Sequence, residues 1–206
     1  MQGIATTFGR TLNVVLLAAT LAALSGCIVP HFYVDDAVKE VPAANLRKTE
    51  PPHPVQVMFE FQTKGAPNAK ATEVLKARVL AQIKDSSVFA DVSEAPVADG
   101  ALLSIQINNV SLTDDVARKG FGTGLTFGLV GTSVDDGYIC TLTYHADAQA
   151  PALVSQARHV LHTTIGNTSA PLNGTPVASA REAAELLTRQ VLSQALNDLT
   201  HKTDFR

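Results

Sequence analysis

The sequence has no tryptophan, only two cysteines, and few aromatic side chains, which make up 5% of its 206 residues. It carries 16 Lys and Arg against 19 Asp and Glu, without a cluster of basic residues. Nucleic acid is held mainly by such clusters, so we expect no nucleic-acid partner. The length is enough for one domain with a hydrophobic core behind an N-terminal extension.

An apolar run near the N-terminus, from Thr11 to Leu24, is too short to span a bilayer. A helical span takes about 20 apolar residues. Arg10 precedes the run, and the small residues Ser25 and Gly26 follow it. A charged start, a short apolar centre and a small-residue cleavage site are typical of a secretory signal peptide. We therefore predict that residues 1–26 are a signal peptide.

Residues 24–27, Leu-Ser-Gly-Cys, resemble the lipobox of bacterial lipoproteins. The resemblance implies that the Cys27 thiol takes a diacylglycerol, that cleavage occurs just before it, and that the freed amine is acylated. Two or more acyl chains hold a protein on a bilayer stably. Ile28 stands where the family's inner-membrane retention signal has an acidic residue, which implies the periplasmic side of an outer membrane if the source has two membranes. The alternative is an uncut segment with Cys27 as a bystander.

Residues 27–54 are predicted to be a lipidated N-terminus and a proline-rich tether. Five of the ten prolines lie there and no period is sustained, which favours an extended, semi-rigid chain. The alternative is that apolar residues of this segment dock on the domain, because exposed apolar clusters tend to be covered. These residues are Ile28, Val29, Phe32, Tyr33 and Val34.

Residues 55–206 are predicted to form a single α+β domain. A period of two predicts strands at 55–63, 101–112 and 138–148, with shorter strands at 88–92 and 159–165. Helical periods predict helices at 69–84 and 180–200, the first capped by Asn68 and the second opened by a capping box of Ser179 and Glu182. The economical architecture is a mostly antiparallel sheet of about five strands with both helices on one face. After acylation of Cys27, Cys140 is the only cysteine left, and it is expected to point inward as a small hydrophobe.

The predicted outer face of the sheet is polar and nearly free of charge. Interface cores are similarly depleted of charge, so this face could bind a partner. The alternative is an ordinary solvent-exposed face, because antiparallel sheets commonly leave one side in contact with water. The face comprises Gln56, Gln62, Ser104, Gln106, Asn108, Thr141, Thr143 and His145.

A glycine-rich apolar segment, residues 120–134, carries no charge and five glycines. Its pattern fits either a strand or a helix with a stripe of small residues, and Asp136-Gly137 after it is a hairpin-turn signal. Its large apolar side chains need cover from the sheet, from another subunit or from the bilayer. We assign a membrane or partner contact to Phe121, Leu125, Phe127 and Leu129.

The titratable residues suggest no reactive site. His159 and His162 are three apart on a predicted strand, so they face opposite sides and cannot share a metal. The acid pairs Asp114-Asp115 and Asp135-Asp136 are expected to be solvated turn residues. No Gly-x-Ser-x-Gly elbow, phosphate loop or His-Glu-x-x-His motif is present. We expect neither a metal site nor a cofactor.

Residues 124–129, Gly-Leu-Thr-Phe-Gly-Leu, and the strand opening Tyr138-Ile139-Cys140 resemble a group of small, uncharacterised bacterial lipoproteins. The order of elements is more loosely similar to envelope-assembly lipoproteins such as the curli-secretion family. The expected function is that of a membrane-anchored envelope lipoprotein, a non-enzymatic module for protein binding or assembly. One alternative is a membrane-inserting or self-associating assembly through residues 120–134. The other is an envelope hydrolase whose site is not recognisable.

Overall fold

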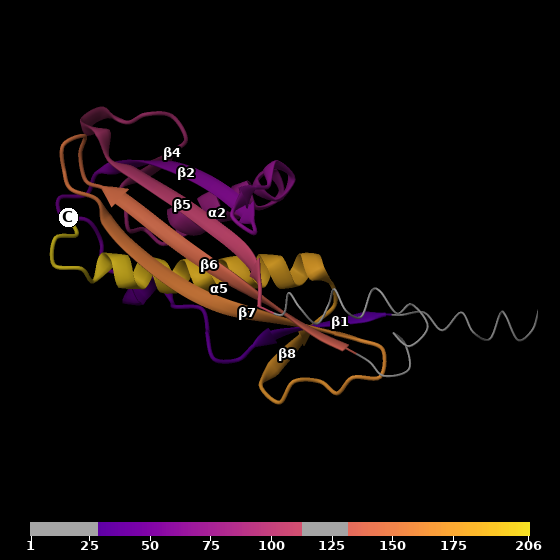
Figure 1. Cartoon of the computed structure of the whole chain (residues 1–206). Coiled ribbons are helices and arrows are strands. Elements are labelled where there is room, and N and C mark those ends of the chain that lie inside the picture. The colour runs from indigo at the N-terminus through magenta and orange to yellow at the C-terminus, as the bar shows by residue number, and fades with distance from the viewer. Residues whose placement is uncertain (1–28, 113–131) are drawn as a thin grey trace, which may run out of the picture.

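The computed structural model describes residues 29–112 and 132–206. Within these ranges eight strands form one sheet in the order β3-β2-β5-β6-β7-β1-β8, with β4 beside β2. Both α-helices lie behind the sheet in the view of Figure 1, with α5 running across β6 and β7. The strands are β1 (Pro30–Asp35), β2 (Pro54–Thr63), β3 (Ala66–Pro67), β4 (Asp91–Ser93), β5 (Leu102–Ser111), β6 (Thr132–His145), β7 (Leu153–Ile165) and β8 (Gly174–Val177). The helices are α2 (Ala69–Asp85), α5 (Ala180–Thr200) and the short 3₁₀ turns η1 (Ala43–Asn45) and η2 (Ala98–Gly100).

The α+β class with two helices and a mostly antiparallel sheet is confirmed, but the prediction of about five strands is wrong. The sheet is also mixed, because β2 runs parallel to both β4 and β5. The crossover through α2 explains this, since a helix after a strand returns the chain so that the next strand runs in the same direction. The strands that sequence patterns missed, β1, β3 and β8, are short and contain proline.

Both predicted helix starts are confirmed. The Asn68 side chain accepts a hydrogen bond from the Ala71 N–H at 3.0 Å. At α5, the Ser179 hydroxyl accepts from the Glu182 N–H at 3.1 Å, and the Glu182 carboxylate accepts from the Ala178 N–H at 2.9 Å. The carboxylate therefore satisfies the N–H one residue before the cap, where a standard capping box would use that of the cap itself.

The core lies between the sheet and the helices. The alternation predicted for β5 and β6 places Ile105 opposite Leu142 and Ile107 opposite Cys140, and all four side chains are buried. The inward orientation of Cys140 is confirmed, and burial raises the pKa of its thiol to about 12.

Two strands are longer than predicted. Asp136-Gly137, predicted to be a hairpin turn, lies inside β6 opposite Ser111 and Val110. A Cβ at Gly137 would lie 3.1 Å from a methyl of Val110, so glycine serves close packing here. β7 begins at Leu153, where it pairs with Tyr144 of β6, ahead of the predicted start at residue 159. Ser155 breaks the apolar pattern there, but its buried hydroxyl donates to the Ala195 carbonyl at 2.7 Å.

The predicted tether at residues 27–54 is wrong for its described part, and the docking alternative holds. β1 pairs with β7 on one side and β8 on the other, and Val34 is buried. Further along, Leu46 and Thr49 are also buried, and the Val41 N–H donates to the Ser193 hydroxyl of α5 at 2.9 Å. Residues 30–54 thus pack on the domain, because their scattered apolar side chains gain more from burial than from exposure.

Candidate functional site

The described chain begins at Val29, two residues after Cys27, and enters β1 at Pro30. Three residues of extended chain span at most about 11 Å. A group attached to Cys27 would therefore lie within about 11 Å of the start of β1. None of the helices described in residues 29–112 and 132–206 is long and apolar enough to cross a membrane.

An Asp–His–Asp cluster, formed by Asp35, Asp135 and His162, joins three neighbouring strands close to this point. His162 on β7 faces Asp135 on β6 through Nδ1 at 2.7 Å and Asp35 on β1 through Nε2 at 3.3 Å. Because both ring nitrogens meet carboxylate oxygens, the doubly protonated ring donates to both. The cluster therefore links β1 to β6 across β7.

The charges of the cluster stabilise one another. Burial works against the charged ring of His162, but the hydrogen bonds and charges of Asp135 and Asp35 outweigh it and raise the pKa of His162 above its ordinary value of 6.5. The pKa of Asp35 is lowered, first by a hydrogen bond from the Ala37 N–H and then, against burial, by His162. The positive ring and its carboxylates thus hold β1 most firmly when the ring is protonated.

His159 lies on the opposite side of β7, as the sequence predicted. Its Nδ1 accepts from the Val160 N–H at 2.9 Å, and its Nε2 donates to the Gln190 side-chain oxygen at 2.8 Å. Burial lowers the pKa of His159, so the ring is neutral and structural. Among residues 29–112 and 132–206, no three His, Cys, Asp or Glu side chains are grouped to hold a metal.

The face of the sheet away from the helices, here called the open face, carries the polar residues predicted for it. Ser104 lies opposite Thr143 and Gln106 opposite Thr141, which places these side chains on one side of β5 and β6. The Gln156 amide of β7 extends the row by donating to the Thr141 hydroxyl at 3.1 Å. The open face is thus a band of mainly neutral hydrogen-bonding groups.

A groove of about 670 Å³ lies between α2, α5 and the segment around η1. Its apolar lining is Val41, Ala43, Leu46, Leu75, Ala81, Leu186 and Leu196. Ion pairs span its rim, Arg78 with Glu185 at 3.0 Å and Arg189 with Glu40 at 2.8 Å. No histidine or cysteine is among the residues that line it. The groove offers contact surface and paired charges, which suit binding.

Most residues that the sequence singled out for contact or modification are not tested. Cys27, Phe121, Leu125, Phe127 and Leu129 lie outside the described residues, as do Asp114 and Asp115. The remaining acid pair corrects the expectation of solvated turn residues, since Asp135 and Asp136 lie within β6 and Asp135 bonds His162.

Sequence reasoning missed the Asp–His–Asp cluster, because β1 was not predicted to be a strand. The cluster joins residues 127 and 27 positions apart in the chain. The apolar side chains of Phe32, Tyr33 and Val34, already noted as able to dock, were the one local signal that this segment joins the sheet.

Comparisons with known proteins show the following. No protein-family model matches the chain, and no curated protein matches it. Among solved structures, a PelC L103M dodecamer from Paraburkholderia phytofirmans matches with 14% identity and a TM-score of 0.35, over 84% of this chain and 100% of that one. A second PelC dodecamer from that organism gives 12% identity and 0.34, over 82% and 98%. Protein XCC0632 of Xanthomonas campestris, assigned to DUF330, gives 14% and 0.34, over 80% and 90%. Structural similarity with identities and TM-scores this low does not assign the chain to a family.

Proposed function

We propose that this chain is an envelope lipoprotein, held on the membrane through acyl chains on Cys27, whose α+β domain binds a protein partner and performs no chemistry. One observation carries the proposal: a lipobox-like Leu-Ser-Gly-Cys ends two residues before the first described residue of the fold. Because β1 is a paired strand of the sheet, an anchor on Cys27 is an anchor on the folded domain itself.

The proposed anchor is permanent on the timescale of the protein's life. Each buried CH₂ contributes about 0.8 kcal/mol, so one chain binds marginally and two or more bind stably. Ile28 gives no acidic retention signal, and we propose the periplasmic side of an outer membrane as the location.

Replacement of Cys27 by alanine tests the anchor. We expect intact mass of the wild-type chain to show loss of residues 1–26 and a gain of acyl groups, and membrane fractions to retain it. The Cys27→Ala chain is expected to keep its signal peptide or to appear in soluble fractions. A wild-type chain of unprocessed, unacylated mass would refute the proposal.

The described surface offers two places for a protein partner, the open face and the groove. A photo-cross-linking side chain at Gln106 reports on the open face, and one at Ala81 reports on the groove. We expect a discrete adduct, identified by mass spectrometry, from one position and none from the other in intact cells. Absence of adducts from both positions would count against a partner-binding role of these surfaces.

Self-association or membrane insertion through residues 120–134 is a second candidate function. It is favoured because the chain flanking this segment, Leu112 and Thr132, lies at the same end of the sheet as β1's start. Liposome flotation and sedimentation of Leu125→Asp and Phe127→Asp chains, compared with wild type, test it. Wild type and variants that are all monomeric and all absent from the lipid fraction once Cys27 is replaced would rule out this candidate.

A further inference from the structure

β2 lies near the rim of the sheet, beside β4 (Figure 1). One side of β2 pairs with β5 without interruption from Gln56 to Thr63. The other side pairs with β4 at residues 54–56 and with β3 at residues 62–63. Among the described residues, no strand pairs with residues 57–61 on that side. We call this stretch the edge gap, and at about 3.3 Å per residue it is about 16 Å long.

Hydrogen bonds at the two ends of β2 show which backbone groups point into the edge gap. The Gln56 N–H donates at 2.9 Å to the carbonyl of the residue just before β5. Phe61 points the opposite way, since its N–H donates to the Thr72 hydroxyl at 2.9 Å and its carbonyl accepts from the Asn68 N–H at 2.8 Å. Backbone groups of successive residues point alternately to the two sides of a strand. The N–H and C=O of Phe59 therefore point into the edge gap, where the described chain supplies no partner strand.

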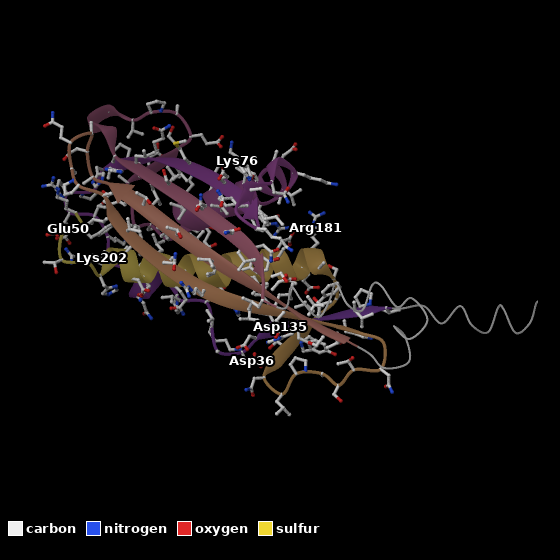
Figure 2. All side chains as sticks on the ribbon, viewed as in Figure 1. Asp36, Glu50, Lys76, Asp135, Arg181 and Lys202 are labelled. Atoms are coloured by element: carbon white, nitrogen blue, oxygen red, sulfur yellow. The ribbon has the colours of Figure 1, made fainter. Side chains whose placement is uncertain are left out.

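A hollow of about 690 Å³ lies against the edge gap. β2 lines it with Phe59 and with Met58, which is 54% exposed, and α2 lines it with side chains of its first two turns. Gln106 of β5 also lines it, so the hollow borders the open face. Lys76 of α2 lies beside β2, on the side of the sheet away from β7 (Figure 2). Pockets that take a ligand measure about 300–1,000 Å³, so a short peptide segment fits here.

The charges around the hollow leave an excess of carboxylate. Lys76 pairs with Glu94, which neutralises its charge. Glu60 accepts a hydrogen bond from the neutral Gln62 amide at 2.6 Å. Within residues 29–112 and 132–206, neither Glu60 nor Glu73 has an ion pair. The hollow therefore favours a segment that carries basic side chains.

We propose that the edge gap accepts an extended segment of a protein partner, which adds a strand to β2 through the N–H and C=O of Phe59. The proposal rests on the proposed partner-binding function and specifies where and how the partner binds. Unpaired strand edges are templates for pairing with another chain, and extended peptides bind sheets in this way. An apolar side chain of the segment packs on Met58, and basic side chains offset the charges of Glu60 and Glu73. Because β3 and β4 flank the gap, the added strand is limited to about five residues.

Photo-cross-linking in intact cells gives the first test. The cross-linking side chain replaces Ala69, exposed in the hollow, or Gln156, exposed on the open face of β7. β7 is three strands away from β2, roughly 14 Å across the sheet. We expect an adduct from position 69, whatever position 156 gives. If position 69 gives none, the proposal is overturned, and an adduct from position 156 or from Ala81 in the groove would then leave the partner-binding function standing.

The second test separates strand pairing from a contact between side chains. A synthetic peptide with the sequence found cross-linked to position 69 is added to the full chain, and the exchange of single backbone amides is followed. We expect saturating peptide to slow exchange of the Phe59 N–H about tenfold and to leave the Met58 N–H, which points toward β5, unchanged. Two further peptides carry N-methyl groups on one or the other set of alternate amides. One should bind and the other should not, whereas equal binding of both, or no slowing at Phe59, would refute strand addition.

The charge of the segment is tested with Glu73→Lys. We expect the affinity for the same peptide to fall about fivefold, as for the loss of an exposed ion pair. Lys84→Glu is the control, because Lys84 is exposed near the other end of α2, and it should change the affinity little. Equal affinities of the two variants would refute a basic segment. A cross-linked peptide that comes from this chain itself would identify a second copy as the occupant, and a separate partner would be refuted.

Discussion

Replacing His162 by glutamine tests how the Asp–His–Asp cluster holds β1, the strand that follows the proposed anchor. Glutamine keeps a hydrogen-bonding side chain but carries no positive charge. His162 bonds two carboxylates, at 2.7 and 3.3 Å. Hydrogen bonds to charged groups contribute about 1.5–3 kcal/mol each. The longer bond and the partial exposure of the three side chains reduce the sum. We expect the free energy of unfolding to fall by about 2 kcal/mol at pH 6.

The pH dependence follows from the direction of the pKa shift. The folded-state pKa of His162 is raised above 6.5, so its contribution to stability is complete below pH 6.5 and is lost as pH rises through the folded pKa. Asp35 has a lowered pKa and contributes above pH 3.8, with loss as pH falls through its folded pKa. The two groups titrate in separate pH ranges, so Asp35 stays charged while His162 loses its proton. His159, with a lowered pKa, acts in the opposite direction to His162, but it is present in both chains and cancels in their difference.

Urea unfolding of the two acylated chains in detergent, followed by circular dichroism between pH 5 and 9, measures this difference. We expect wild type to exceed His162→Gln most at pH 5–6 and progressively less toward pH 9. At pH 9 the difference is expected to be small, because the neutral ring and the glutamine amide can each donate a hydrogen bond to a carboxylate. A difference that is constant over this range, or that grows with pH, would refute the assignment of the charged ring to the cluster.

Two further predictions concern parts of the fold that the sequence anticipated. Ser179→Ala removes the cap of α5 and should lower the free energy of unfolding by about 1 kcal/mol, against little change for the exposed loop variant Ser169→Ala, both measured by urea unfolding. Equal effects would contradict the cap. Cys140 should react with a thiol reagent only as fast as the chain unfolds, because it is buried and burial raises its pKa to about 12. Rapid reaction in native buffer would show that the core is open there.

Sequence patterns correctly predicted the helices and strands whose hydrophobic period is regular. The period of two in β2 and β5 and the apolar stripe of α5 arise because one side of each element is buried against a neighbour. The caps Asn68 and Ser179 are equally local, since each bonds a backbone N–H three residues on. The caps could be predicted from sequence because each hydrogen-bond partner lies only three residues further along the chain.

Local patterns failed where a distant partner decides the conformation. Gly137 reads as part of a turn, yet it is a strand residue that leaves space for Val110. Ser155 interrupts the apolar side of β7, yet it is satisfied by a carbonyl of α5. β1 is only six residues long and starts with a proline, and it becomes a strand because β7 and β8 supply its hydrogen bonds.

The sequence by itself determined the elements with strong periods, the inward side of Cys140 and the resemblance of residues 24–27 to a lipobox. Only the tertiary structure decided that β2 and β5 run parallel, that residues 30–54 belong to the domain, and that Asp35, Asp135 and His162 meet. The physical reason is that apolar residues recur about every two residues in a strand and about every four in a helix, so the sequence shows which side of each element is buried. Which strands become neighbours depends instead on how the whole chain closes around one core, and a pattern along the sequence carries no record of that choice.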